Sequence, residues 1–421
     1  MIAWGSILAI VLLLLSVPIF LVFGIGSSLI ATIDLRQPFT TLLQVSYGAI
    51  TKHVLLSIPL FIFAGLVMLR AGVAGRLVHL CITLVGHLPG GLGIAMVLAM
   101  GFFAAFCGSI LAAITAVGSI LMPSMVERGY DKPFVVLLAA TAGLLEVLIP
   151  PSNGAIIFSA LTDVPVSKTF AAGVLPGFVF MALLIIYVSF ACRRMERAAQ
   201  ATWAARRSAF VQAIPGLLTP VIILGGIYGG LLTPSESAAA AAVYAIFVGF
   251  LIHRELTFKG LLDAVRSTAL TTTVIFSIIA MATFMSVILT FTRAPQTIVE
   301  YFIVYGVTPL TFLIVVGIIC LILGTFLEAI PVIYLTVPVF LAVIEHYGID
   351  IIHFYVVFGA FVGLGLLTPP VCVGVYTAAA VIREAPERAF RAVPAFLAVG
   401  LVYAALMIAF PTVATWLPSK L

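Results

Sequence analysis

Long apolar segments follow one another along this 421-residue chain, from its first residues to about Trp416. A helix needs about 20 apolar residues to cross the hydrocarbon core of a membrane, and segments of that length recur throughout. The polar stretches between them are too short to form a separate soluble domain. The pattern therefore predicts an all-α polytopic membrane protein.

Two of the predicted spans carry a proline pair near their middle, Pro150-Pro151 in the first half and Pro369-Pro370 in the second. Proline removes a backbone hydrogen bond and clashes with the preceding turn, so each pair splits its span into two half-helices. Lipid cannot satisfy the freed backbone groups, which survive at membrane depth only inside protein or beside a wet cavity. Corresponding breaks in two halves indicate a transporter with a site near the membrane midplane.

The two halves of the chain also match outside the breaks, since Met122-Pro123 with Glu127 corresponds to Val337-Pro338 with Glu345. We therefore predict two repeats, 1–208 and 209–421, each with scaffold spans, a re-entrant helical hairpin, a broken helix and a closing span. The hairpins are predicted at 94–125 and 310–344, the broken helices at 133–161 and 351–382, and the closing spans at 171–192 and 393–417.

Charge predicts how each half is oriented. Apolar residues make up 63% of the chain and charged residues 8%, and much of the net charge of +5 comes from arginines in short loops. Because Lys and Arg in short loops are retained in the cytoplasm, the most basic loop is predicted to lie inside. Counting spans from it places Arg128 and Lys132 inside and Glu345 outside, so the hairpins enter from opposite faces, as inverted-topology repeats require. The basic loop contains Arg193, Arg194, Arg197, Arg206 and Arg207.

The first span is ambiguous, because residues 2–34 fit either one long span kinked near Pro18 or two short spans. Strict inversion favours two short spans with the N-terminus outside. The positive charge sets this topology and does not indicate a nucleic-acid partner.

Polar residues gather at the hairpin turns and at the first break. Ser109 follows Gly108 in the first turn, and Ser152 and Asn153 begin the half-helix after the first break. Exposed amides and the positive dipole end at such a helix start favour an anion. Since no Lys or Arg lies in the middle of a span, an anionic solute would be held by amides, hydroxyls and co-bound cations.

Two acidic residues lie deep in apolar surroundings. Glu146 stands four residues before Pro150, on the helix face of the break, and Glu328 lies in the second hairpin turn. An ionised carboxylate at membrane depth costs about 2.5–3.5 kcal/mol on the insertion scale, so each is expected to have a partner or a cation. For Glu146, a cation ligand, a proton carrier and a protonated structural acid are all open interpretations.

Taken together, several segments resemble the large membrane subunit of the tripartite ATP-independent periplasmic (TRAP) transporters, the DctM type. The resemblance covers essentially the whole chain and depends on the order and spacing of the segments. They are 58–65, 85–92, 118–123 leading to 128–131, 149–152, 220–228, 233–236 and 365–370.

This resemblance implies an elevator-type transporter in the bacterial inner membrane that takes up an organic anion, such as a carboxylate or sugar acid, with sodium. It also implies a small four-helix membrane subunit of the DctQ type and a periplasmic substrate-binding protein of the DctP type, and no organic cofactor. Two sodium sites are expected, the first from Gly108, Ser109, Glu146, Ile149 and Pro151, the second from Gly324, Glu328, Gly365, Thr368 and Pro370. The candidate solute ligands are Ser109, Ser152, Asn153, Thr325 and Pro370.

The chain departs from the family pattern at the first site. Relatives carry an acid soon after the Gly-Ser of the first hairpin, whereas Leu111, Ala112 and Ala113 stand here, and Glu146 replaces a usual glycine. Either the carboxylate has moved to the facing helix and still serves the cation, or the first site uses a proton. Glu328 also replaces the usual aspartate, a longer side chain that could shift the second site.

Three other functions can be weighed on the same residues. A stand-alone sodium- or proton-coupled dicarboxylate carrier without a binding protein is the main alternative, although the family segments fit the tripartite type better. An intramembrane hydrolase would need a Ser/His dyad, a His-Glu-x-x-His run or paired aspartates, and the sequence contains none of these. A channel is disfavoured because hairpins from both faces around one site suit alternating access. The chain is therefore not expected to be an enzyme.

Overall fold

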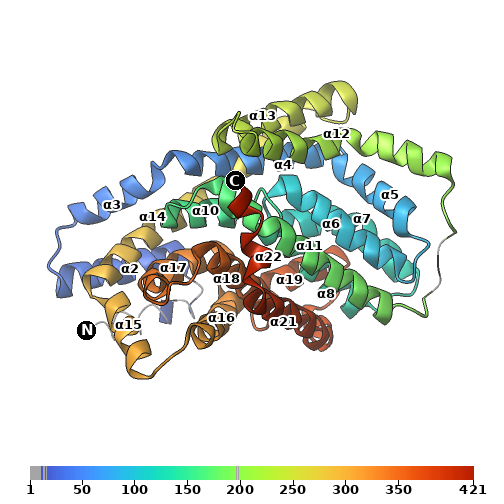
Figure 1. Ribbon diagram of the computed structural model, residues 1–421. Helices are drawn as coiled ribbons and strands as arrows, with labels where there is room; N and C mark the ends of the chain where they lie inside the picture. The colour runs from blue at the N-terminus through green and yellow to red at the C-terminus, as the bar shows by residue number, and fades with distance from the viewer. Residues whose placement is uncertain (1–10, 13–14, 16, 196, 198) are drawn as a thin grey trace.

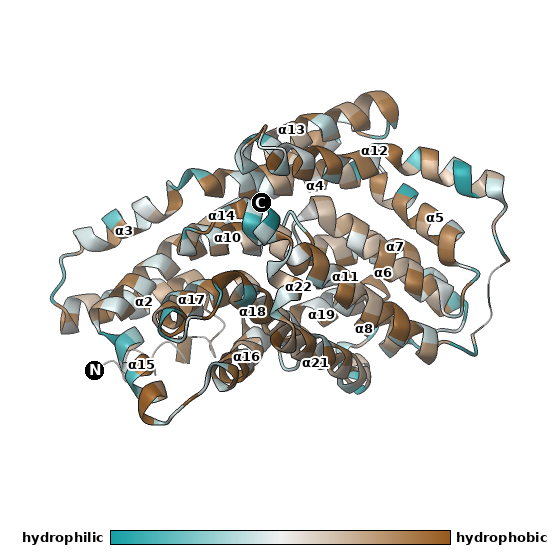
Figure 2. Cartoon of the chain, in the orientation of Figure 1, coloured by the Kyte–Doolittle hydropathy of each residue, from teal (hydrophilic) through white to brown (hydrophobic). Residues whose placement is uncertain are grey.

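The structure is a computed structural model that describes residues 11–12, 15, 17–195, 197 and 199–421. Every regular element in this part of the chain is helical, and ten helices are long and apolar enough to cross a membrane. Figure 2 shows that apolar residues cover most of the helical surface. These observations confirm the predicted all-α polytopic membrane protein. The question of one or two spans in residues 2–34 falls partly outside the described residues. Within the described residues, α2 (Ile19–Leu29) is the first long helix.

One group of helices forms a frame around the hairpins and broken helices. In Figure 1, α12 and α13 lie along the top beside α4, while α14, α2 and α3 lie to the left. Thr233 opens α13 with a reciprocal cap, since its hydroxyl accepts from the Glu236 amide while the Glu236 carboxylate accepts from the Thr233 amide. The frame consists of α2, α3 (Thr40–Ile50), α4 (Ser57–Arg70), α5 (Val73–Val85), α12 (Trp203–Tyr228), α13 (Pro234–Phe247), α14 (Phe258–Phe291) and α15 (Ala294–Val304).

Both predicted hairpins are present within a few residues of their expected bounds. The first turn passes through Gly108, whose φ of 62° suits glycine, and Ser109 then caps the second arm by accepting from the Ala112 amide. The second turn passes through Leu327 and Glu328. The arms are α6 (Gly91–Cys107) with α7 (Ile110–Glu127), and α16 (Pro309–Phe326) with α17 (Ala329–Tyr347).

Both proline pairs break their spans as predicted, and both Pro-Pro bonds are cis. In the most apolar part of the first broken helix 83% of residues are buried, against at most 50% in the other nine candidate spans of the described chain. Protein therefore surrounds the unpaired backbone of this break and shields it from lipid. The first broken helix comprises α8 (Lys132–Gly143), α9 (Leu145–Leu148) and α10 (Asn153–Thr162), and the second comprises α18 (Ile351–Gly365) and α19 (Val373–Val381).

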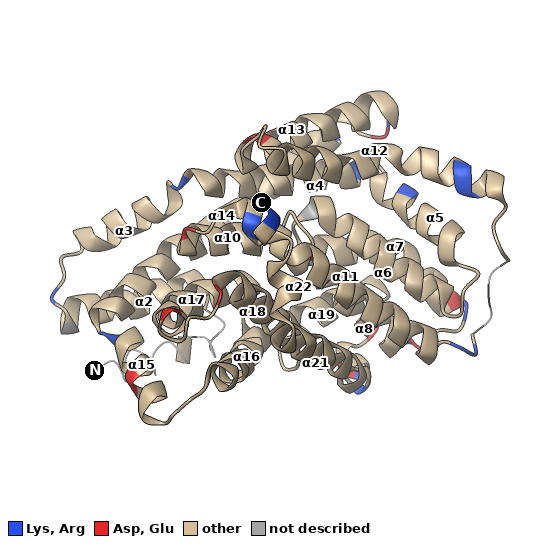
Figure 3. Cartoon of the chain, in the orientation of Figure 1, with Lys and Arg blue, Asp and Glu red and all other residues tan. Residues whose placement is uncertain are grey.

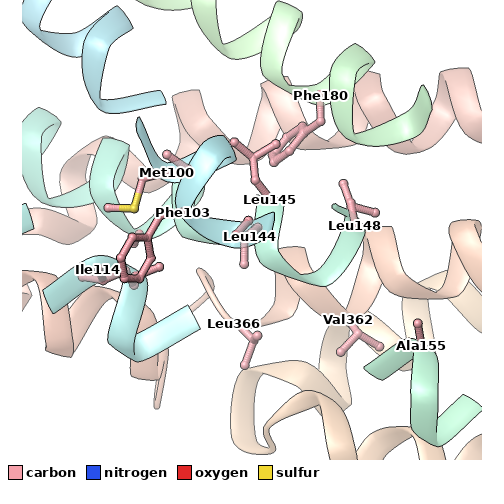
Figure 4. Packing of buried hydrophobic residues seen from close by; sticks show 14 of the residues in the cluster. Met100, Phe103, Ile114, Leu144, Leu145, Leu148, Ala155, Phe180, Val362 and Leu366 are labelled. Carbon is pink, nitrogen blue, oxygen red and sulfur yellow. The ribbon is translucent and has the colours of Figure 1, made fainter. Parts of the chain in front are cut away.

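The two halves pack against each other reciprocally. The second arm of each hairpin lies against the second half-helix of the opposite half, α7 on α19 and α17 on α10. Figure 4 shows the apolar contact between the broken helices at the centre, where Leu144 and Leu148 face Val362 and Leu366. The closing spans, α11 (Val166–Ala191) and α21 (Val393–Ala409) with α22 (Pro411–Thr415), complete this core unit.

Ion pairs show which helix ends share a face of the protein. Asp131 pairs with Arg391 at 2.6 Å and Lys132 pairs with Glu384 at 2.9 Å, so the start of α8 lies beside the segment that follows α19. The charge pattern places these two segments on one side, and the structure agrees. Because each broken helix crosses the core unit, the first starts at the face where the second ends. The inverted orientation of the two hairpins stays a prediction.

Charged residues lie mainly at helix ends and connections (Figure 3). Glu146 is the only Asp, Glu, Lys or Arg among the buried residues that the structure describes. The division of the chain into repeats at residue 208 stays a prediction.

Candidate functional site

The tips of both hairpins and both helix breaks meet around one cavity of about 460 Å³. Scaffold helices α4 and α14 close it with Ile62, Thr271 and Ile275. The cavity thus combines the two halves and the frame, as a solute site shared between repeats requires. Its polar lining consists of Ser109, Glu146, Ser152, Asn153, Thr271, Glu328 and Tyr355.

Four helices begin at this cavity. They are α7, α10, α17 and α19, and lining residues include their first residues Ile110, Asn153, Ala329 and Val373. The first amides of a helix lack partners within the helix and carry partial positive charge. The fold therefore directs four electropositive helix starts at one cavity, which stabilises negative charge there without any Lys or Arg among the described lining residues.

The first hairpin tip is tied to the first break through Asn153. Its side-chain amide donates to the carbonyl oxygen of Gly108, and Ser109 and Ser152 line the cavity on either side of this bond. The other polar atom of the Asn153 side chain, Oδ1, is buried without a hydrogen-bond partner. The three first-half residues predicted to contact solute are therefore brought together, and one of them has a free acceptor.

The two acidic residues face the same cavity from different halves. Glu146, only 5% exposed, lines the cavity from the first break, and Glu328 lines it from the tip of the second hairpin. Glu328 is the residue that precedes α17, and its side chain is exposed toward the cavity. Glu146 thus lies at the break, on the face that the sequence predicted, and its role stays a prediction.

The residues predicted for the second ion site are only partly gathered. Gly324 and Gly365 touch through their backbones, because a Cβ placed on Gly365 would lie 2.6 Å from the Gly324 Cα. The hydroxyls of Thr325 and Thr368 donate to carbonyl oxygens of their own helices, at 2.8 and 2.9 Å. Neither threonine lines the cavity, and neither does Pro370, which is exposed.

At the first break, Ile149 and Pro151 also lie away from the cavity lining. The Ile149 side chain packs toward Gly177 of α11, where a Cβ would meet it at 2.7 Å. Their backbone carbonyls are the only groups they could offer an ion. The apolar side chains themselves serve packing.

Tyr355 is a lining residue that the sequence analysis missed. It projects from α18, its hydroxyl donates to the Val147 carbonyl oxygen at 3.4 Å, and it also reaches Ser152 of the opposite half. Its ring lies 4.9 Å from that of Phe158, centroid to centroid. The available signal was a tyrosine in a half-helix that is apolar apart from His353. Whether that tyrosine reaches the break depends on how the two halves pack.

A polytopic helical protein whose two hairpin tips and two broken helices converge on one buried cavity belongs to the class of membrane transport proteins. The model of the family described as "Tripartite ATP-independent periplasmic transporter, DctM component" matches residues 5–413. The chain belongs to this DctM family. The resemblance drawn from the sequence is thereby confirmed, and the protein is a transporter component rather than an enzyme.

Curated relatives agree along the whole chain. The C4-dicarboxylate TRAP transporter large permease protein DctM of Vibrio cholerae is 34% identical over 442 residues, which cover 99% of this chain and 97% of that protein. The ectoine/5-hydroxyectoine TRAP transporter large permease protein UehC of Ruegeria pomeroyi is 33% identical over 379 residues, 90% of this chain and 89% of that protein. The isethionate TRAP transporter permease protein DctMQ of Oleidesulfovibrio alaskensis is 32% identical over 420 residues. That match covers 97% of this chain, which spans only 64% of the longer protein.

Among solved structures, the crystal structure of the YdaH transporter of Alcanivorax borkumensis is similar to the fold. The TM-score is 0.59 with 15% sequence identity, over 96% of this chain and 98% of that chain. At this identity the likeness concerns the fold alone.

Proposed function

We propose that the protein is the large membrane subunit of a tripartite transporter that takes up an organic acid together with sodium across the bacterial inner membrane. The single observation that carries this proposal is the enclosed cavity where both hairpin tips and both breaks meet. Its four helix starts suit a carboxylate. In agreement with this, relatives are named as transporters for C4-dicarboxylates, isethionate and ectoine.

Coupling to sodium supplies the energy for accumulation. Each sodium ion that moves inward across about 100 mV contributes about 2.3 kcal/mol before its concentration gradient is counted. We propose one ion near Gly108, Ser109 and the carbonyls of the 149–151 stretch, and a second near Gly324, Gly365 and the 368–370 stretch. The close contact of Gly324 with Gly365 supports the second position, because it places carbonyls of two chain segments next to one another.

The partners are proposed from the family. A periplasmic binding protein would deliver the acid, and a small four-helix subunit would brace the frame. Exposed apolar side chains on α12 and α14, including Val221, Leu218, Leu262 and Leu270, offer a surface for lipid or for such a subunit.

Reconstitution tests the function directly. In proteoliposomes containing the chain with its small subunit, uptake of the acid bound by the cognate binding protein should require that binding protein and an inward sodium gradient. Omission of each component in turn provides the controls. Uptake that persists without sodium when only a proton gradient is present would refute the sodium coupling.

We further propose an elevator movement of the core unit against the frame. The Tyr334 side chain on α17 lies near Thr283 on α14, where these two helices pack together, so this contact joins the two units and would slide during transport. In a background without native cysteines, a short bismaleimide cross-link between Thr283→Cys and Tyr334→Cys should abolish uptake.

The matched control is a cross-link within the core unit. Phe134 of α8 and Phe396 of α21 have ring centroids 5.5 Å apart, and both would move together. A link between Phe134→Cys and Phe396→Cys should leave uptake intact. Full activity in the Thr283–Tyr334 pair after complete cross-linking would contradict a sliding movement at this interface.

A further inference from the structure

The cavity carries an unusual balance of charge for a site that is to hold an acid. Two carboxylates, Glu146 and Glu328, line it, while its lining among the described residues contains no Lys, Arg or His. A second acidic group of the solute would lie near these two acids, whereas a cationic group would pair with either of them. The charges on the lining therefore distinguish between classes of acid.

Both acids lie near helix starts. Glu146 lies near the start of α7, and Glu328 directly precedes α17 without forming a cap hydrogen bond to it. The starts of α10 and α19 remain for a solute carboxylate, with Ser152 contributing a hydroxyl at the first of them.

A second observation concerns an acceptor that is not an acid. Asn153 is buried, its amide nitrogen is used by the Gly108 carbonyl, and its Oδ1 has no partner. A buried acceptor without a donor is costly, so the site lacks an N–H or O–H group that a bound molecule would bring. Because Asn153 lines the same cavity as Glu146, that donor would sit beside the carboxylate.

We propose that the transported solute is a zwitterion, a carboxylic acid that also carries a cationic nitrogen, and that Glu146, Glu328 and the Asn153 Oδ1 atom face this nitrogen. Its carboxylate lies at the start of α10. The proposal rests on the function proposed above only in taking this cavity as the solute site. Sodium could use the same oxygens, but a cavity of about 460 Å³ admits a small organic molecule rather than a lone ion.

Binding to matched solutes tests the proposal without any gradient. The full chain in nanodiscs would be titrated by calorimetry with pairs of equal chain length, such as 4-aminobutyrate with glutarate and 3-aminopropionate with succinate. Quaternary ammonium and amidinium carboxylates of three to six carbons extend the panel. The cationic member of at least one pair should bind about tenfold or more tightly than its dicarboxylate.

Substitutions then assign the preference to residues. Glu146→Gln, which keeps the shape of the side chain, should reduce the ratio of the two affinities at least about fivefold, and Glu328→Gln should reduce it as well. Glu127→Gln is the matched control, because Glu127 is exposed at the far end of the first hairpin. Thermal unfolding of each variant shows whether it is folded, and Glu328→Gln carries the test if Glu146→Gln is not.

The outcomes separate the proposal from its rivals. Tighter binding of the dicarboxylate in every pair, or no binding by any cationic member, overturns it. Titrations in sodium chloride and in potassium chloride test whether Glu146 binds sodium instead of the solute nitrogen. In that case Glu146→Gln changes how solute affinity depends on sodium and leaves the ratio of the two solute affinities unchanged. This outcome also overturns the proposal. A failure of sodium-driven uptake would refute the coupling while leaving the binding ratio as predicted.

Discussion

The contact between Gly324 of α16 and Gly365 of α18 makes a sharp prediction about the second half of the site. An added Cβ on Gly365 would lie 2.6 Å from the Gly324 Cα and 2.6 Å from the Leu321 carbonyl oxygen. Carbon atoms pack best at about 3.5–4.0 Å, so Gly365→Ala forces the two helices apart by roughly 1 Å. Both obstructing atoms belong to backbone, which cannot rotate away as a side chain can.

The size of the effect follows from two opposing terms. Overpacking of this kind costs about 1–3 kcal/mol. Replacing a helical glycine by alanine returns about 0.5–1 kcal/mol. Gly365→Ala should therefore be destabilised by up to about 2.5 kcal/mol. Gly359→Ala in the same helix is the matched control, because its Cβ would meet only Val147 Cγ1 at 3.6 Å, an ordinary contact.

Thermal unfolding of the purified protein in detergent measures the difference. Gly365→Ala should melt below the wild type and lose uptake, since the separation displaces the proposed second ion site. Gly359→Ala should melt at or above the wild type. If Gly365→Ala melts as high as Gly359→Ala, the close approach does not constrain this crossing, and the reasoning from backbone contact is wrong.

Three further substitutions test other contacts. The hydrogen bond from Lys132 is the main cause that holds the pKa of Glu384 below its ordinary value of 4.5. The ionised carboxylate therefore stabilises the fold above pH 4.5, and this contribution is lost as the pH falls through the lowered pKa. Glu384→Gln should melt below the wild type at pH 7, and the difference in melting temperature should disappear in acid. Asn153→Ala leaves the Gly108 carbonyl without its donor and should cost about 1–3 kcal/mol, seen as a lower melting temperature and faster proteolysis at the hairpin tip. Thr233→Ala removes a helix cap and should cost about 0.5–2 kcal/mol, whereas Thr233→Ser should be nearly neutral in the same melting assay.

Much of the fold could be predicted because its determinants are local. The break at Pro150-Pro151 and the apolar runs around it are properties of a short window, and the helices end where proline chemistry requires. The cap at Thr233 was equally readable, since Thr233 and Glu236 specify it within four consecutive residues. Even the shared face of Lys132 and Glu384 follows from a count of spans and the retention of basic loops.

The details of the site depend on contacts between distant segments, which no local window contains. That Asn153 would bind Gly108, and that Tyr355 would reach Ser152, is decided by how two hairpins and two broken helices pack. The hydroxyl of Thr368 was equally available to an ion or to its own helix, and the structure shows it bonded to the Leu364 carbonyl oxygen. Residue type alone does not distinguish these uses.

Both halves contain a hairpin and a broken helix, but they line the cavity with different side chains. The two ends of the cavity are therefore chemically unlike. The first break is followed by Ser152 and Asn153, whereas the second is followed by apolar Val371 and Cys372. Most polar groups at the cavity therefore come from the first half, and the second contributes chiefly Glu328 and Tyr355. A solute with unlike ends would meet different partners at each end, so it should bind in one orientation. If so, exchanging the polar pair 152–153 with the apolar pair 371–372 would preserve the four helix starts yet abolish uptake, because the backbone plan alone does not select the solute.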